Sequence, residues 1–360
     1  MTRKSLAGKN NVPITDPVAS ARSSGLRYYP DSKPGYSRRR SGKGFVYLDT
    51  NGEVIRDPDE LFRIRSLVIP PAWNNVWICP VENGHLQATG RDAKGRKQPR
   101  YHTRWREVRD EAKYNRMVDF AYELPAIRRR VREDLKSPGL GFQKVMATVV
   151  RLLETTYMRV GNQEYARQNG SYGLTTLRNR HARVRGTRVQ FQFRGKSGKA
   201  HNVEINDARL AKIVRRCLDI PGYELFQYLD ENGESHSIDS ADVNEYLRTI
   251  TGKDFTAKDF RTWAGTVGAA IALQENQEFE SMAEAKRNIV QAIVCVSEQL
   301  GNTPAVCRKC YIHPLIFESY LERLTQKPAV RKSSRGPKRV SGLRIAEARV
   351  LHLLEAKTEG

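Results

Sequence analysis

The chain has 360 residues, of which 39% are hydrophobic, and its formal net charge at pH 7 is +22. This length predicts about two to three domains, and the apolar content is sufficient for packed cores. No run of about 18 apolar residues occurs, which excludes a transmembrane helix. No apolar segment follows the basic N-terminal residues, so we expect no secretory signal.

The positive charge is spread along the whole chain. Residues 1–40 carry +7, residues 327–360 carry +6, and the 286 residues between them carry +9. Solvated tails would account for the charge at the two ends, but not for the charge of the body. The distribution therefore favours a polyanionic partner, and nucleic acid in particular, that contacts the folded part of the protein.

The five cysteines are an odd number in a large chain, which is typical of a reduced, cytoplasmic protein. Cys307 and Cys310 have the spacing of a metal-binding pair, and His313 follows them. A zinc site requires four ligands, and no second pair lies at ligand spacing. We therefore expect no metal site and interpret these cysteines as structural or incidental.

The N-terminal part is expected to contain two segments of different character. Residues 1–43 are basic, rich in Ser, Gly and Pro, and lack periodic apolar spacing, so they predict a disordered arm. Residues 44–112 predict a compact β-rich domain with strands at 45–48, 76–79 and 86–89. Asp57-Pro58 provides an acidic N-cap and a proline at the first position of a short helix between the first two strands.

A glycine-flanked basic loop, residues 90–98, follows the third of these strands. It carries four candidate phosphate ligands, Arg91, Lys94, Arg96 and Lys97. Tyr101 lies just beyond the loop. Cations bind phosphates, and aromatic rings pack on sugars or bases. The alternative is an ordinary solvated turn.

Residues 113–326 predict a mostly helical domain with a small three-stranded antiparallel sheet. Apolar residues at three- and four-residue steps predict one long helix from Phe142 to Val160. Strands are expected at 172–177, 189–193 and 203–205, with Lys196 at the tip of a hairpin. Further helices are expected at 207–218, 240–250, 258–274, 283–299 and 314–325. Residues 327–360 predict a basic tail that ends in a weak helix, and the fold class is α+β.

Five residues are candidates for chemistry at a phosphodiester: Arg159, Lys196, Arg261, Asn302 and Tyr311. Each has a simpler explanation by itself. Arg159 could be an exposed helical arginine, Lys196 a solvated turn residue, and Arg261 the partner of Asp259. The asparagine could only end a helix, as Leu300-Gly301-Asn302 suggests, and the tyrosine could belong to a core. Only their ordered combination favours a reaction.

That combination resembles the type IB DNA topoisomerases, specifically the bacterial, poxvirus-like branch. The resemblance covers about residues 44–325. Its segments are Gly90-Arg91-Asp92 to Tyr101-His102, Arg159-Val160-Gly161-Asn162 with Tyr165, Gly173-Leu174-Thr175-Thr176-Leu177, Gly195-Lys196, Lys258-Asp259-Phe260-Arg261-Thr262-Trp263, and Gly301-Asn302-Thr303-Pro304 with Tyr311. Two positions depart from the pattern: Asn302 stands where the family often has histidine, and Pro99 where bacterial relatives often have tyrosine.

The resemblance implies a role for each of these residues. Tyr311 would be the nucleophile, giving a 3′-phosphotyrosyl link, while Arg159 and Arg261 hold the non-bridging oxygens. Lys196 would protonate the leaving 5′ oxygen, and Asn302 would donate a hydrogen bond to the phosphate. Asn162, Tyr165 and the basic loop would contact DNA. The resemblance further implies a monomeric clamp on double-stranded DNA in the cytoplasm, bound to chromosomal DNA, with no ATP, metal or cofactor.

Two other functions remain open at this point. A tyrosine site-specific recombinase would use related chemistry, but that family typically has histidine three residues before its second arginine, where this chain has Lys258. A non-enzymatic DNA-binding protein would need the charge but not the ordered set of five residues.

Overall fold

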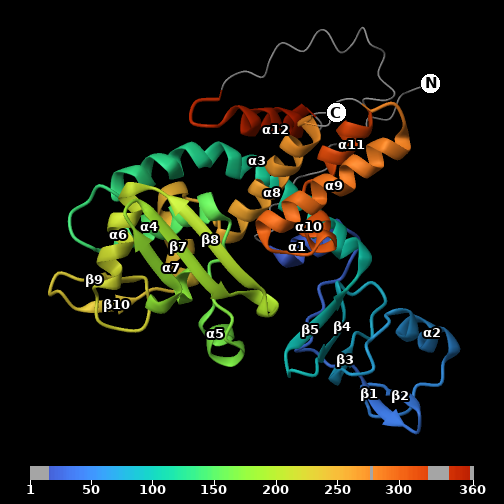
Figure 1. The fold of residues 1–360 in the computed structure, drawn as a ribbon. Helices are drawn as coiled ribbons and strands as arrows, with labels where there is room; N and C mark the ends of the chain where they lie inside the picture. Colours follow the sequence, from blue (N-terminus) through green and yellow to red (C-terminus); the bar gives the residue numbers. More distant parts are fainter. Residues whose placement is uncertain (1–15, 276–278, 323–339, 357–360) are drawn as a thin grey trace. The chain divides into compact units, whose positions relative to one another are not determined.

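A computed structural model describes residues 16–275, 279–322 and 340–356 (Figure 1). The chain divides into two compact units, residues 1–116 and residues 117–360. Strands and helices occur in separate sheets and bundles, so the expected α+β fold class is confirmed. None of the described helices is long and apolar enough to cross a membrane.

The first unit is built on a five-stranded antiparallel sheet with the strand order β2-β1-β3-β4-β5. Its strands are β1 (Tyr36–Ser41), β2 (Gly44–Leu48), β3 (Asn74–Ile78), β4 (Leu86–Arg91) and β5 (Lys97–Tyr101). Helix α2 (Pro58–Ser66) begins at the predicted cap, where Asp57 accepts a hydrogen bond from the backbone N–H of Asp59. Ile64 of this helix packs against Val76, Ile78 and Ala88 of the sheet, which gives the unit its core.

The prediction of a disordered arm over residues 1–43 is wrong for the part that the structure describes. Helix α1 (Pro17–Ser23) and strand β1 both lie in it. Within β1, the Arg38 guanidinium donates hydrogen bonds to the carbonyls of Ile69, Pro70 and Trp73, at 3.1, 2.9 and 2.8 Å. These carbonyls follow α2 by sequence, so composition alone gave no sign of the contact. Residues 1–15 of the predicted arm lie outside the described residues.

The second unit is mainly helical. Helix α3 (Thr103–Asp134) spans the division between the units. The other helices are α4 (Phe142–Thr156), α5 (Gln163–Asn169), α6 (Ala208–Leu218), α7 (Ser240–Thr251), α8 (Ala257–Glu275), α9 (Met282–Leu300), α10 (Pro304–Cys310), α11 (Pro314–Glu322) and α12 (Ile345–Ala356). The unit also contains a two-stranded ribbon, formed by β9 (Gln227–Leu229) with β10 (Ser235–Ser237).

A three-stranded antiparallel sheet lies in this unit, as predicted, with the order β6-β7-β8. Its strands are β6 (Ala182–Arg185), β7 (Arg188–Arg194) and β8 (Ala200–Asn206). The predicted first strand, residues 172–177, is wrong, because Leu174–Thr176 form a 3₁₀ turn. The hydroxyls of Thr175 and Thr176 donate to backbone carbonyls there, which is the local alternative to a strand ladder.

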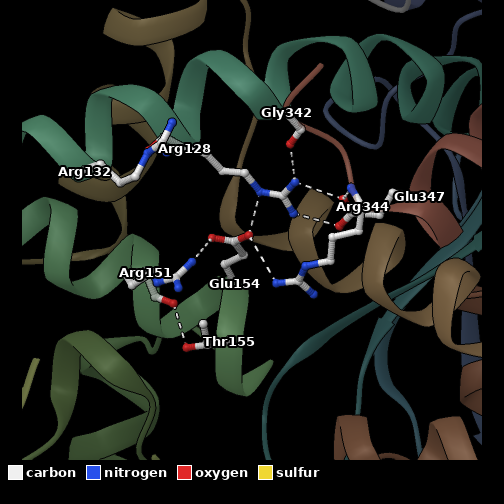
Figure 2. Close-up of polar contacts among 8 residues, drawn as sticks. All are labelled: Arg128, Arg132, Arg151, Glu154, Thr155, Gly342, Arg344 and Glu347. Carbon is white, nitrogen blue, oxygen red and sulfur yellow. Dashed lines mark hydrogen bonds and ion pairs between the residues drawn. The ribbon is translucent and has the colours of Figure 1, made fainter. Parts of the chain in front are cut away.

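Residues 340–356 belong to the core of the second unit, so the expectation of a basic tail with a weak helix is corrected for these residues. Helix α12 packs beside α8 and buries Ala348, Val350, Leu351 and Leu354. Figure 2 shows the ion pairs at its start. Arg128 of α3 contacts Glu154 of α4 at 2.7 Å and Glu347 of α12 at 2.7 Å. Residues 327–339 and 357–360 lie outside the described residues.

Candidate active site

Arg159 follows helix α4 in a segment without helix or strand, and the prediction that it continues the helix is wrong. The helix ends at Thr156 because Tyr157 adopts a left-handed conformation with φ of 56°. Two glycines then cross: a Cβ on Gly173 would lie 2.6 Å from the Cα of Gly161 and 2.7 Å from the carbonyl oxygen of Arg159. Only glycine permits this approach, so the crossing holds the backbone of Arg159 in place.

Arg261 lies in the first half of α8, and only 4% of its surface is exposed. Its guanidinium donates hydrogen bonds to two backbone carbonyls, that of Tyr157 and that of Leu300, the latter at 2.7 Å. These carbonyls end α4 and α9 respectively, so one side chain connects three helices. A guanidinium has five N–H donors in a fixed plane. The two carbonyls therefore orient the group and leave other donors for a ligand.

Asn302 follows the C-terminus of α9. Gly301 ends that helix in a left-handed conformation with φ of 60°, and the N–H of Asn302 donates to the carbonyl of Ser297 at 2.9 Å. The side-chain Oδ1 of Asn302 accepts a hydrogen bond from Arg159. Its Nδ2 lies buried beside the Cys307 thiol, without a hydrogen bond of acceptable geometry. The amide therefore has a donor to offer at the site.

Tyr311 caps the C-terminus of α10. Its backbone packs on α8, where a Cβ on Gly265 would lie 2.6 Å from the Tyr311 carbonyl oxygen. Thr266 donates its hydroxyl to that oxygen at 3.3 Å. The guanidinium carbon of Arg261 lies 5.2 Å from the centre of the Tyr311 ring, a cation–π distance. Helix α8 thus fixes both the arginine and the backbone of the tyrosine.

The site carries two neighbouring cations. Burial and the Arg261 guanidinium lower the pKa of Arg159, although an arginine stays protonated in proteins. None of the ion pairs found among the described residues includes Arg159 or Arg261. Four of the five candidates, Arg159, Arg261, Asn302 and Tyr311, are therefore together at a site suited to an anion.

Lys196, the fifth candidate, lies at the tip of the β7–β8 hairpin, as predicted. Its side chain is exposed. No hydrogen bond or ion pair joins it to the other four candidates in the described part of the chain. A second residue of this hairpin, His201, contacts Gly301. Sequence reasoning did not single it out, because its only signal is its position on a strand with alternating burial.

The basic loop of the first unit is a tight β4–β5 hairpin. Asp92 accepts hydrogen bonds from the backbone N–H groups of Lys94 and Arg96, each at 3.0 Å. The Arg96 side chain lowers the pKa of Asp92 to about 2. Lys97 pairs with Asp31 at 2.5 Å, while the Lys94 side chain is exposed.

The other predicted DNA contacts have mixed environments. Arg91 is exposed and donates to the Gly95 carbonyl at 2.8 Å. Tyr101 packs against a small core cluster that contains Trp105. Asn162 caps α5, a helix that the sequence did not predict, by accepting from the N–H of Tyr165 at 3.0 Å. Tyr165 itself is 48% exposed.

One group of potential metal ligands occurs among the described residues. Asp230, Glu234 and His236 lie together at the β9–β10 turn. His236 contacts Asp230 at 2.9 Å, and Asp230 caps the turn by accepting from two backbone N–H groups. These contacts stabilise the turn, which accounts for the proximity of the three side chains. None of the five candidates belongs to this group.

Two family models together match most of the chain. The model described as eukaryotic DNA topoisomerase I, catalytic core, matches residues 102–335. The model described as bacterial DNA topoisomerase IB, N-terminal domain, matches residues 44–92. DNA topoisomerase 1B of Acanthamoeba polyphaga mimivirus is 33% identical over 295 residues, which cover 79% of this chain and 87% of the viral protein. The chain belongs to the type IB DNA topoisomerase family.

A more distant relative agrees with this assignment. DNA topoisomerase 1B of vaccinia virus (strain Copenhagen) is 24% identical over 235 residues, which cover 64% of this chain and 70% of the viral protein. The chain is thus a DNA topoisomerase of type I, an isomerase, and the recombinase alternative is not favoured. The site described above lies in the part that the catalytic-core model matches.

Proposed function

We propose that this topoisomerase relaxes supercoiled duplex DNA by cutting one strand, allowing rotation, and resealing the cut. The Tyr311 hydroxyl attacks a phosphorus, so that a bond forms between the phenolic oxygen and phosphorus and the bond from phosphorus to the 5′ oxygen breaks. The phenol releases its proton to solvent, and Lys196 supplies one to the departing 5′ oxygen. The phosphotyrosine keeps the energy of the broken bond, so that resealing requires no ATP.

The observation that carries this proposal is the convergence of Arg159, Arg261, Asn302 and Tyr311 from four separate segments of the chain. Guanidinium groups held beside the phenol stabilise charge that develops on the phosphate and on the attacking oxygen. The unpartnered Nδ2 of Asn302 supplies a neutral hydrogen-bond donor to a non-bridging oxygen. Because the two arginines supply the positive charge, we propose that the reaction needs no metal or cofactor.

Residues 44–112 are proposed as a DNA-clamp domain, which β1 extends, and residues 113–326 as the catalytic domain, which α12 extends. The β4–β5 hairpin offers exposed cations for phosphate, and α5 offers Tyr165 to the duplex. We further propose that the enzyme acts as a monomeric clamp in the cytoplasm on chromosomal DNA. The reduced state of all five cysteines is compatible with that compartment.

The proposal is tested with wild type and Tyr311→Phe on a supercoiled plasmid in excess chelator. Wild type should relax the plasmid and, after denaturation, remain covalently attached to the 3′ side of a nick. Phenylalanine keeps the ring beside Arg261, so that folding and non-covalent DNA binding should persist while relaxation and the adduct disappear. An adduct formed by Tyr311→Phe would reject the nucleophile, and loss of wild-type cleavage in chelator would reject the metal-free reaction.

A further inference from the structure

His201 lies between the backbones of two glycines that belong to different parts of the site. A Cβ on Gly195 would lie 2.6 Å from Cδ2 and Nε2 of His201, and a Cβ on Gly301 would lie 2.6 Å from its Cε1. The imidazole therefore occupies space that a side chain at either glycine would need. Gly195 immediately precedes Lys196, and Gly301 immediately precedes Asn302. One ring thus touches the two segments that carry these candidates.

The orientation of the His201 ring is fixed from the neighbouring strand. Phe193 on β7 lies directly opposite His201 on β8, and the two rings stack with centroids 5.0 Å apart and planes 9° apart. Phe193 is buried. Cross-strand aromatic pairs of this kind stabilise a hairpin and restrict its rings. The stack therefore holds His201 in the position that contacts Gly301.

The surroundings of His201 disfavour a positive charge on its ring. Burial lowers its pKa, and so do three cations that face it from different segments: Arg159 after α4, Lys199 on the hairpin and Arg261 on α8. A third positive charge beside Arg159 and Arg261 would add repulsion at the site. A neutral, flat ring contacts both backbones without that repulsion.

We propose that His201 is a positioning residue that docks the β7–β8 hairpin on the Gly301–Asn302 turn and so places Lys196 at the leaving oxygen. Lys196 has an exposed, flexible side chain at a hairpin tip and no partner of its own in the described structure. The contact through His201 is a link between this hairpin and the residues around Tyr311. The inference rests on the proposed role of Lys196 as the general acid.

Single-turnover cleavage of two substrates separates positioning from a general structural role. The first substrate is a normal phosphodiester, and the second has sulfur at the bridging 5′ position. A thiolate leaves without receiving a proton, so the second substrate does not need the acid. Replacing His201 with alanine removes the ring, and misplacement of a catalytic group by about 1 Å can slow a reaction on the order of a hundredfold.

His201→Ala should cleave the normal substrate about tenfold to a hundredfold more slowly than wild type, and the sulfur substrate within about threefold of wild type. Lys196→Ala should show the same split with a larger defect. Asn202→Ala, which removes a side chain that bonds Gln190 on the exposed face of the same hairpin, should show no split. Cleavage of the sulfur substrate also reports that each variant is folded and binds DNA.

Two results with His201→Ala would overturn the inference, provided that Lys196→Ala still shows its split. One is equal slowing of both substrates, and the other is cleavage of the normal substrate at the wild-type rate. Absence of the split in Lys196→Ala would instead remove the proposed acid, and with it the role given to His201. The two failures are therefore distinguished by the same assay.

Discussion

Arg128 and Glu347 lie 219 positions apart in the sequence and are joined by two hydrogen bonds of 2.7 and 2.9 Å. The same guanidinium contacts Glu154 at 2.7 Å (Figure 2). Glu154 lies near the end of α4, two residues before the helix stops and Tyr157 turns towards Arg261. The C-terminal helix is thereby attached to the helix that leads into the active site.

Glu347→Gln should lower the free energy of unfolding by about 1–3 kcal/mol, because a charge-assisted pair at a nearly buried Arg128 is lost while Glu154 remains. Denaturant unfolding measures this. Glu245→Gln is the matched control, since its partner Arg248 and the glutamate itself are each 57% exposed and such pairs contribute under about 1 kcal/mol. Equal effects of the two substitutions would contradict a structural role for the α12 contact.

The contribution of Glu347 should also depend on pH. Burial alone would raise the pKa of Glu347, but hydrogen bonds from Arg128 and from the Arg344 backbone lower it overall. A lowered pKa means that the carboxylate stabilises the fold fully above its ordinary pKa, about 4.3. The difference between wild type and Glu347→Gln should therefore shrink as the pH falls below that value.

Arg261→Lys should slow single-turnover cleavage on the order of a hundredfold to a thousandfold, with little change in DNA binding. An ammonium group cannot contact the Tyr157 and Leu300 carbonyls in one plane and still face Tyr311, as the guanidinium does. Arg287→Lys, on the exposed side of α9, is the control for the same chemical change. A near-normal rate in Arg261→Lys would show that charge alone is sufficient.

Replacing Lys94, Arg96 and Lys97 together with alanine should weaken DNA binding and flatten its salt dependence. Each lost phosphate contact should reduce the slope of log affinity against log salt by about 0.9. Arg96 and Lys97 are exposed themselves, with side-chain exposures of 48% and 58%, so that both can reach a phosphate. The cleavage rate on saturating DNA should change little. An unchanged salt slope would mean that the hairpin does not contact DNA.

Acid should destabilise the first unit partly through His85. Burial lowers the pKa of His85, which stacks on Tyr28 at 4.3 Å. The unfolded chain therefore binds a proton that the folded one excludes, and stability falls as the pH drops below about 6.5. Hydrogen exchange of β4 amides should show less acid sensitivity in His85→Gln than in wild type. The half-exposed His236, replaced with glutamine, should leave that sensitivity unchanged.

Sequence reasoning predicted the local backbone around the candidate site in part only. Apolar spacing through Tyr157 and Val160 predicted a continuous helix, because periodicity does not register the left-handed turn at Tyr157. The run 172–177 has strand-forming residues, yet the crossing of Gly161 and Gly173 imposes a 3₁₀ turn. Both errors arise from contacts between segments that are distant in sequence.

The prediction of disorder failed for residues 16–43 for a related reason. Its composition is that of a disordered arm, but Arg38 finds three carbonyls from residues 69–73, and Asp31 binds Lys97. Motif order, in contrast, named Arg159, Arg261, Asn302 and Tyr311 as candidates, and these four residues lie together in the structure. The proximity of these four side chains could thus be anticipated from motif order, whereas the contacts of His201 with Gly195 and Gly301 could not.

The guanidinium groups of Arg159 and Arg261 lie close enough together that each charge disfavours the other. An oxyanion that binds between the two guanidinium groups would relieve this repulsion. Binding of a DNA phosphate at this place should therefore raise the thermal stability of the second unit.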